Sequence, residues 1–270
     1  MLEIVNSLSK STQIEVENFL IFLGIYEDRV REKRLKRLLR KNLSFIKGKI
    51  GVEAGAGLGL MTEYILRLGV KKLYAVEENK YCYLYLKEKF KKAKNIEIIN
   101  EKIQNFTPPQ NVDFLFQELY GALLLDESIL ALERIRFKPE IILPDSGKIV
   151  GQVTSLKEIN DPVINMKLFK NLKGVLVTDL FPNYKMKNPF VIAEWHFKPG
   201  RKNYMFKHNL KKSGEVLILG MEIWDKGEKV LGSYESYNWP LVFTPVDGKC
   251  FCLSFIYRGN YTEVKFNWIG

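Results

Sequence analysis

The sequence predicts an α/β protein in two parts: a mostly parallel, doubly wound sheet, then an antiparallel β-barrel or β-sandwich. Three observations point to this fold class. Apolar strand-like segments alternate with helical ones as far as about residue 145. A glycine-rich turn at 51–60 (GVEAGAGLGL) joins the first strand to a helix. Beyond residue 145, short segments rich in β-branched and aromatic residues are separated by turn residues.

The first part of the chain opens with helices within 12–46. In the basic run 29–41, Leu35, Leu38 and Leu39 recur at helical spacing, which indicates an amphipathic helix with one buried edge. Short apolar runs then predict parallel strands covered on both faces by helices. The strands are expected at 49–53, 72–76, 96–99, 112–116 and 139–143, and the helices between them at 60–68, 79–91 and 126–135.

The second part consists of runs rich in Val, Ile, Phe, Tyr and Trp. Turn residues such as Asp247-Gly248 and Gly259-Asn260 separate the runs, a pattern typical of antiparallel sheets. The strands are expected at 148–153, 174–179, 190–197, 215–224, 228–235, 241–244, 250–257 and 261–268. The boundary between the two parts is expected near Pro144-Asp145.

Composition excludes several classes of protein. The 270 residues are 46% apolar, enough for a sizeable core, and no apolar run reaches the ~18 residues of a membrane span. The N-terminus carries acids and lacks the apolar core of a signal peptide, so we expect a cytoplasmic protein. The three cysteines, Cys82, Cys250 and Cys252, lack metal-type spacing and are expected to be reduced thiols.

The formal charge of +11 is partly concentrated in the runs 29–41 and 87–94. Such a surface attracts nucleic acid or acidic partners; the alternative is the solvated helix faces of a lysine-rich protein. The two histidines, His196 and His208, belong to no catalytic or metal-ligand pattern, so we predict no metal site.

The glycine-rich turn is the most informative motif of the chain. Glu53 ends an apolar strand, and Gly55, Gly57 and Gly59 follow at alternate positions. Glycine permits tight turns and close approach of a ligand to the backbone, and the helix that follows offers unpaired N–H groups. The dinucleotide fingerprint differs, because its third glycine comes three residues after its second. The pattern resembles motif I of the class I S-adenosylmethionine-dependent methyltransferases; a tight turn with spare glycines is the alternative.

A second acidic strand end follows in LYAVEEN, 73–79. In doubly wound sheets an acid at the end of the second strand accepts hydrogen bonds from ribose hydroxyls. Glu77 falls directly at the end of this strand and is the chosen residue, with Glu78 as the neighbouring possibility. The alternative interpretation is a solvated acid at a strand end.

The segment VDFLFQELYGALLLDES, 112–128, closely resembles the double-glutamate loop of the protein arginine methyltransferases. In that family two glutamates, nine residues apart as Glu118 and Glu127 are here, bracket the substrate guanidinium. Two carboxylates can fix the plane of this permanent cation in fork geometry. Without the resemblance, Glu118 is a loop acid, and Glu127 is an acid near a helix N-terminus, which the helix dipole favours.

Three further segments resemble the same family, and the resemblance runs from about residue 22 to 150. They are the segment that closes over the cofactor (23–34), the exit from the cofactor domain (136–145) and the loop written Thr-His-Trp (237–243). The resemblance implies S-adenosyl-L-methionine as cofactor and a protein substrate with an exposed arginine. It also implies an N-terminal cap over 1–46, a Rossmann-like cofactor domain over 47–145 and a β-barrel-like substrate domain over 146–270.

The resemblance also assigns roles to individual residues. It makes Glu118 and Glu127 the catalytic pair and Tyr120 and Trp239 weaker candidates for the acceptor side. An arginine of the closing segment meets the methionine carboxylate; Arg34 is chosen, although Arg31 lies equally near the family position. The remaining cofactor contacts are Glu53, Gly55, Gly57 and Glu77. Gln104 is a weaker candidate: many methyltransferases have a polar residue near the adenine after the third strand, where this family usually has an acid.

Several positions depart from the family pattern. The family's Tyr-Phe-x-x-Tyr segment is absent, and VENFL stands at 16–20. Asn238 replaces the histidine of the Thr-His-Trp loop, Arg29 replaces the usual methionine of the closing helix, and Ile129 follows Glu127-Ser128 where methionine is common. The segment 155–190 is short for the family's dimerisation arm, which we interpret as trimmed or lost, so a dimer is not implied.

Two other functions fit the sequence at this stage. The basic charge is compatible with a methyltransferase acting on RNA or on an RNA-bound protein. Against it, the fourth strand ends in QELY and lacks the Asn/Asp-Pro-Pro-aromatic motif used on base amino groups. The missing aromatic segment and histidine are compatible with a regulator that binds the cofactor without catalysis.

Overall fold

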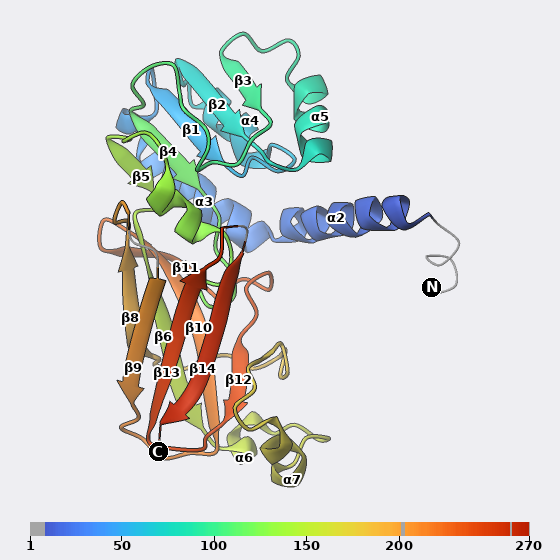
Figure 1. The fold of residues 1–270 in the computed structure, drawn as a ribbon, viewed down its shortest axis with the longest axis vertical. Helices are drawn as coiled ribbons and strands as arrows, with labels where there is room; N and C mark the ends of the chain where they lie inside the picture. Colours follow the sequence, from blue (N-terminus) through green and yellow to red (C-terminus); the bar gives the residue numbers. More distant parts are fainter. Residues whose placement is uncertain (1–8, 201–202, 260, 270) are drawn as a thin grey trace. The chain divides into compact units, whose positions relative to one another are not determined.

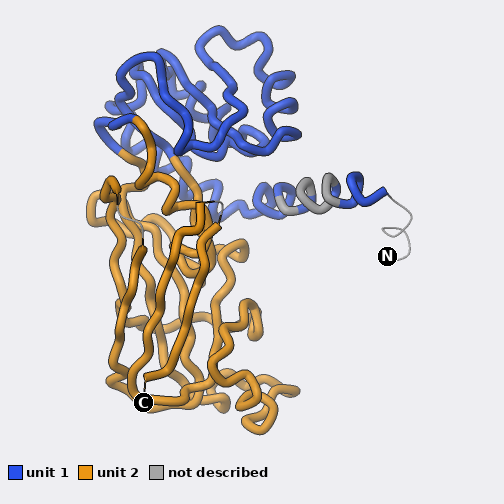
Figure 2. The backbone as a smooth tube through the Cα atoms, in the orientation of Figure 1, with its two compact units in different colours: residues 1–116, 137–141 blue, residues 117–136, 142–270 orange. Residues whose placement is uncertain are grey.

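The computed structural model describes residues 9–200, 203–259 and 261–269. It consists of two compact units, drawn in blue and orange in Figure 2. Unit 1 contains the chain up to residue 116 together with 137–141, and unit 2 contains 117–136 and 142–270. The stretch 117–136 precedes the predicted boundary near Pro144-Asp145, yet its contacts place it in unit 2.

Two helices open unit 1, α2 (Lys10–Glu27) and α3 (Arg29–Lys41), and they meet at Asp28. The buried Asp28 carboxylate accepts a hydrogen bond from the Arg31 N–H at 2.9 Å and caps α3. Leu35, Leu38 and Leu39 are buried, which confirms the amphipathic helix. A short 3₁₀ turn, η1 (Leu43–Phe45), follows.

The sheet of the first part has the strand order β3-β2-β1-β4-β5 (Figure 1). β1 pairs with β2, and β2 with β3, in parallel, as the alternating pattern predicted. Successive strands extend from β1 to one side and then from β4 to the other, so the carboxyl end of β1 borders the position where ligands bind in such sheets. The strands are β1 (Ile50–Ala54), β2 (Lys72–Val76), β3 (Ile96–Ile99), β4 (Phe114–Gln117) and β5 (Ile141–Leu143), and the helices after β1 and β2 are α4 (Leu60–Arg67) and α5 (Lys80–Lys89).

Packing inside this sheet explains one glycine of β1. A Cβ on Gly51 would lie 2.1 Å from Cζ of Phe114, so the ring of Phe114 occupies the place of the missing side chain. Val52 and Leu73 are fully buried beside it. The strands are therefore packed on both faces, as expected of a parallel sheet.

Unit 2 is built on antiparallel sheets, which confirms the predicted change of architecture. One sheet has the order β7-β12-β10-β6-β8, with β11 paired to β10, and the other has the order β14-β13-β9. Together they fit the sandwich form of the prediction. The strands are β6 (Ser146–Thr154), β7 (Val177–Thr178), β8 (Phe190–His196), β9 (Asn203–Asn209), β10 (Val216–Asp225), β11 (Glu228–Gly232), β12 (Val242–Pro245), β13 (Cys250–Tyr257) and β14 (Thr262–Ile269).

Some elements differ from the prediction. Strand β9 was not predicted, because most of its residues are polar and only Tyr204 among them is buried. The strand predicted over 174–179 is reduced to β7, and the chain before it forms short helical turns. These turns are α6 (Leu156–Ile159), α7 (Met166–Phe169) and η3 (Lys170–Leu172).

The helix predicted over 126–135 is shorter and of the 3₁₀ type, η2 (Ile129–Arg134). The reason is local: the Asp126 carboxylate turns back and accepts a hydrogen bond from the Leu123 N–H at 3.0 Å. Residues 126–128 therefore belong to the preceding loop. η2 is tied to the sheets by the buried Glu133, which accepts hydrogen bonds from Trp195 Nε1 at 3.1 Å and from the Tyr204 hydroxyl.

Among the described residues, none of the helices combines the length and the apolar composition that a bilayer crossing requires.

Candidate functional site

The glycine-rich turn after β1 has a backbone that other residues rarely adopt. Gly55, Gly57 and Gly59 all have positive φ, of 72°, 55° and 79°. The N–H groups of Gly55 and Ala56 donate to the Val76 carbonyl at 2.9 and 3.2 Å, which fixes the turn to the end of β2. The glycines chosen from the sequence are thus required by this backbone conformation.

Glu77 is bonded directly to that turn. Its Oε2 accepts a hydrogen bond from the Gly57 N–H at 2.8 Å, and its Oε1 accepts one from the Asn79 N–H at 2.7 Å. Burial raises the pKa of the Glu77 carboxyl, and these backbone donors offset only part of the rise. Glu78, the alternative, is exposed and lies 3.9 Å from Lys102 Nζ. The structure therefore brings Glu77, rather than Glu78, to the glycine turn.

Glu53 is buried at the end of β1, with 2% of its surface exposed. Its Oε2 accepts a hydrogen bond from the Thr62 hydroxyl at 2.6 Å. Thr62 lies in the first turn of α4 and is itself fully buried. The pair links β1 to α4 on either side of the glycine turn, a role for Thr62 that the sequence did not indicate.

Two aromatic residues of α2, one helical turn apart, cover the glycine turn. The ring of Phe22 lies 3.5 Å from the position of a Cβ on Gly57. The hydroxyl oxygen of Tyr26 accepts a hydrogen bond from the N–H of Leu60, the first residue of α4, at 2.9 Å. Burial raises the pKa of Tyr26, so its hydroxyl keeps its proton. Sequence reasoning missed both residues because the family's aromatic segment is absent at 16–20, although their spacing of four was a signal.

Replacing Tyr26 with phenylalanine is expected to lower the free energy of unfolding by about 1 kcal/mol, because the Leu60 N–H loses its acceptor. Denaturant titration measures this change. The matched control is Tyr85→Phe, since Tyr85 is half exposed on α5. Equal stability of Tyr26→Phe and the wild type would contradict the capping role.

The remaining predicted cofactor residues lie on neighbouring elements of unit 1. Gln104 is partly buried in the turn that follows β3. Arg34 is partly buried on α3, whereas Arg31, the alternative, is 6% exposed. Burial of a guanidinium is costly unless it is paired, which makes Arg31 the more constrained of the two arginines.

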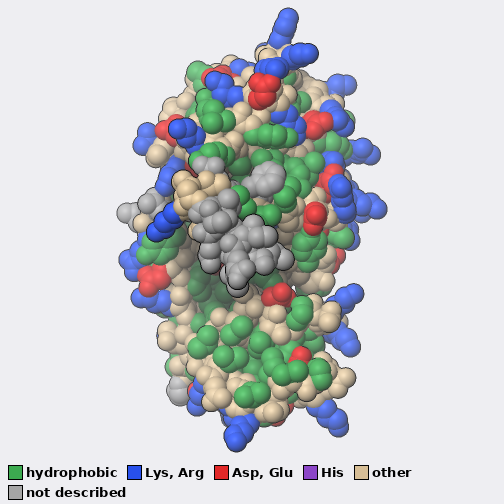
Figure 3. Space-filling model, turned by 90° about the vertical axis from the view of Figure 1, so that its right-hand side faces the viewer, with side chains coloured by type: hydrophobic (Ala, Val, Ile, Leu, Met, Phe, Trp, Pro, Cys, Tyr) green, Lys and Arg blue, Asp and Glu red, His purple; other side chains and the backbone are tan. Residues whose placement is uncertain are grey.

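The outer face of α3 carries the rest of the basic run, with Lys33, Arg37 and Arg40 exposed. On the face drawn in Figure 3, lysine and arginine side chains are scattered over both units.

The loop after β4 carries the two predicted catalytic acids, both in unit 2. Glu118 is partly buried and Glu127 is exposed. The Thr262 hydroxyl, at the start of β14, donates to the Glu127 carbonyl oxygen at 2.8 Å. This bond fixes the backbone at Glu127 to a strand far away in the sequence, and Thr262 was not predicted.

Tyr120, a residue of that loop, packs against Trp239. Each is 2% exposed, and their rings meet edge to face with centroids 6.2 Å apart. Gln117 Nε2 donates to the Tyr120 hydroxyl. Burial raises the pKa of Tyr120, and the nearby acids Glu118, Asp145 and Asp225 raise it further.

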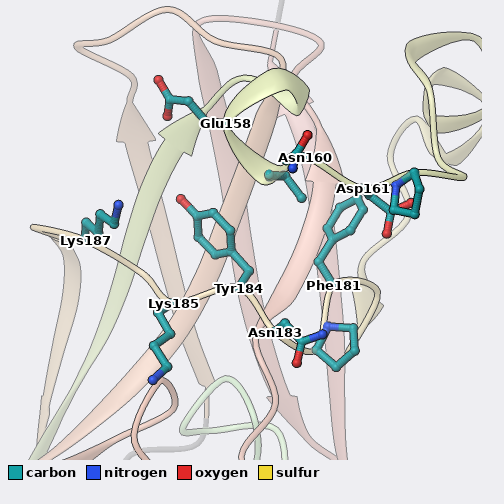
Figure 4. Close-up of a pocket in the computed structure, with 11 residues that line it drawn as sticks. Glu158, Asn160, Asp161, Phe181, Asn183, Tyr184, Lys185 and Lys187 are labelled. Carbon is teal, nitrogen blue, oxygen red and sulfur yellow. The ribbon is translucent and has the colours of Figure 1, made fainter.

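A cavity of about 410 Å³ lies elsewhere in unit 2, and none of the predicted site residues lines it. In Figure 4, Phe181 and Tyr184 point toward the short helix that carries Glu158, whereas Lys185 points away. Both rings pack edge to face on Phe243, at 5.0 and 6.4 Å between centroids. The lining consists of Glu158, Ile159, Asn160, Asp161, Pro162, Phe181, Pro182, Asn183, Tyr184, Lys185 and Lys187.

The two histidines occupy unrelated places. His208 stacks on Phe190 with the ring centroids 4.9 Å apart, and burial lowers the pKa of His208. His196 is exposed on β8. In the part of the chain that the structure covers, no three His, Cys, Asp or Glu side chains gather as metal ligands would.

Comparison with known proteins supports the resemblance seen in the sequence. A family model described as PRMT5 arginine-N-methyltransferase matches residues 6–139. Protein arginine N-methyltransferase 6 of Xenopus tropicalis is 26% identical over 159 residues, covering 57% of this chain and 46% of that protein. The enzyme of the same name from Danio rerio is 28% identical over 159 residues, 57% of this chain and 45% of that protein. The chain thus spans less than half the length of these relatives.

Solved structures of the same class share the fold. A crystal structure of PRMT6 superposes with a TM-score of 0.72 at 10% identity, covering 93% of this chain and 99% of that one. The Trypanosoma brucei PRMT1 enzyme–prozyme complex with AdoHcy gives 0.65 at 14% identity, covering 92% and 93%. These structures confirm the Rossmann-like fold with a C-terminal antiparallel domain, and the family model and the relatives confirm the resemblance to protein arginine methyltransferases that the motifs predicted.

Proposed function

We propose that this chain is an S-adenosylmethionine-dependent methyltransferase that methylates arginine side chains of a protein. One observation carries the proposal: the Glu77 carboxylate is bonded to the N–H of Gly57 in a left-handed glycine turn at the end of β1. A buried acid joined to such a turn is the arrangement expected for an adenosine-containing cofactor in a doubly wound sheet. The family match over residues 6–139 supports S-adenosylmethionine as this adenosine-containing cofactor.

The residues around the glycine turn fit this cofactor. Gly55 and Gly57 allow its methionine part to approach the backbone, because at these φ values side chains are strained. Glu77 keeps acceptor capacity on both oxygens for the two ribose hydroxyls. Phe22 and Tyr26 cover the turn, which supports the N-terminal segment 1–46 as a cap.

Further cofactor contacts are proposed from the family positions. Arg34, or the more deeply buried Arg31, would hold the methionine carboxylate. Glu53 would orient the methionine part from the end of β1 while its bond to Thr62 holds it in place. Gln104 would lie beside the adenine.

The acceptor arginine is held by Glu118 and Glu127. A guanidinium stays cationic at neutral pH and presents a planar set of donors. Two carboxylates on opposite sides of it fix its plane and draw positive charge away from the nitrogen that reacts. When bound, S-adenosylmethionine supplies an activated methyl group; Glu127 then takes up the proton that the methylated nitrogen loses.

The proposal is tested by incubating the protein with methyl-labelled cofactor and an arginine-rich peptide, beside the same peptide with lysine at every arginine. We expect label on the arginine peptide alone, located on arginine by mass spectrometry, and cofactor binding by calorimetry. Label found on RNA after protease treatment would support the nucleic-acid alternative instead. Cofactor binding without transfer to any protein or RNA would support the regulator.

A further inference from the structure

The loop between Glu118 and Glu127 is organised around one carboxylate, that of Asp126. Its Oδ1 accepts a hydrogen bond from the Leu123 N–H at 3.0 Å. Asp126 is partly buried, and this burial raises the pKa of its carboxyl although the Leu123 N–H lowers it.

The Asp126 carboxylate packs directly against Gly121. A Cβ on Gly121 would lie 2.2 Å from Oδ1, 2.5 Å from Cγ and 2.8 Å from Oδ2 of Asp126. These separations are too short for any side chain, so the carboxylate fills the space that Gly121 leaves. The φ of Gly121 is not in the left-handed region, so close packing, rather than backbone freedom, requires this glycine.

The backbone between these two residues is strained. Leu124 has a φ of 68°, a left-handed conformation that costs about 1–2 kcal/mol for a residue with a side chain. It forms an isolated bridge with Gly121, and its N–H donates to the Gly121 carbonyl at 3.0 Å. Such a conformation persists only where its surroundings hold it, and the Asp126 carboxylate accepts the N–H of the preceding residue, Leu123.

The residue after Asp126 is Glu127, whose carbonyl oxygen is held by Thr262. Asp126 therefore fixes the loop on one side of Glu127, and Thr262 fixes it on the other. Any movement of residues 121–126 would change where the Glu127 carboxylate points relative to Glu118.

We infer that Asp126 is a positioning residue for arginine methylation: by accepting the Leu123 N–H and packing on Gly121, it sets the arrangement of Glu118 and Glu127. The inference rests on the proposed function, since it assigns Asp126 to the acceptor clamp without making it contact the substrate.

The test compares Asp126→Ala and Asp126→Asn with the wild type on the arginine peptide. Asp126→Ala should lower kcat by about 100-fold, because a displaced catalytic group costs that much, and should raise KM for the peptide while cofactor affinity stays unchanged. Asp126→Asn should retain part of the activity, because its amide oxygen still accepts the Leu123 N–H. The matched control is Asp161→Ala, since Asp161 likewise accepts the N–H groups of Val163 and Ile164.

A second set of variants tests the packing itself. Gly121→Ala should reduce kcat in the wild-type background, and the reduction should be smaller when Asp126 is already alanine, because the collision is then absent. Hydrogen exchange at the Leu123 amide should quicken in Asp126→Ala. We call the bond of Asp126 to Leu123 and its packing on Gly121 the brace. Both measurements distinguish loss of the brace from a general loss of folding, because a general loss of folding would weaken cofactor binding as well.

Wild-type kcat and KM in Asp126→Ala, or an equal cost of Gly121→Ala in both backgrounds, would overturn the inference. If the wild type itself binds no cofactor and transfers no methyl, the proposed function fails instead. Hydrogen exchange at Leu123 then still reports whether Asp126 braces the loop, and unchanged exchange in Asp126→Ala would reject the brace as well.

Discussion

Replacing Glu127 with glutamine is expected to slow methyl transfer to an arginine peptide by about 10³-fold, the cost of removing one charge-stabilising group from a reacting centre. The amide is similar in shape but carries no negative charge and cannot take up the proton. Cofactor affinity should stay unchanged, because Glu127 is proposed to hold the acceptor arginine, whereas the glycine turn, Glu53 and Glu77 are the proposed cofactor contacts. Single-turnover kinetics, with calorimetry of the cofactor, measure both quantities.

The matched control for this variant is Glu140→Gln, which makes the same chemical change at an exposed acid outside the site. It should behave as the wild type. Wild-type turnover in Glu127→Gln would remove Glu127 from the catalytic pair while leaving the cofactor site intact.

Replacing Glu77 with glutamine is expected to weaken cofactor binding by about 100-fold, the equivalent of two lost charge-assisted hydrogen bonds of about 1.5 kcal/mol each. In the wild type the Gly57 and Asn79 N–H groups donate to the two carboxylate oxygens of Glu77. In the glutamine variant one of these N–H groups would face the NH₂ group of the amide, so that two donors meet and one hydrogen bond is lost. Glu78→Gln is the neighbouring control, because Glu78 is exposed. Calorimetry measures the dissociation constants, and equal values for the two variants would reject Glu77 as the ribose acid.

The pH dependence of this site follows from the raised pKa of Glu77. Since the bound cofactor needs the ionised carboxylate, affinity should fall as the pH falls through that raised pKa, and Glu77→Gln should lack this decline. Without cofactor, the free energy of unfolding should instead rise as the pH falls. The folded state holds the proton more tightly than the unfolded state, so the unfolding free energy contributed by Glu77 rises as the pH falls through this range.

Much of the cofactor site could be predicted because its signals are local in the sequence. Positive φ at Gly55, Gly57 and Gly59 follows from the glycine pattern, and Glu77 from its place at a strand end. The structure adds the bond between Gly57 and Glu77, which joins the two motifs. Only the structure shows that Glu77 is bonded to the turn while Glu78 is exposed, and that Arg31 is buried more deeply than Arg34.

The less regular parts could not be predicted for identifiable reasons. Strand β9 is half exposed and mostly polar, so it lacks the apolar run by which the other strands were found. The 3₁₀ helix η2 starts late because the Asp126 side chain competes with helix formation by bonding the backbone before it. The contacts of Tyr26 with Leu60 and of Thr262 with Glu127 join residues far apart in the chain, and nothing local indicates them.

The sequence alone determined the fold class and the candidate residues, because periodicity, glycine spacing and strand-end acids are set by backbone geometry within a few residues. It also carried the resemblance to protein arginine methyltransferases. Only the tertiary structure decided which aromatic residues cover the glycine turn, how Tyr120 meets Trp239 and how Asp126 packs on Gly121. These are contacts of shape and hydrogen bonding, and they exist only once the elements that carry them have been brought together.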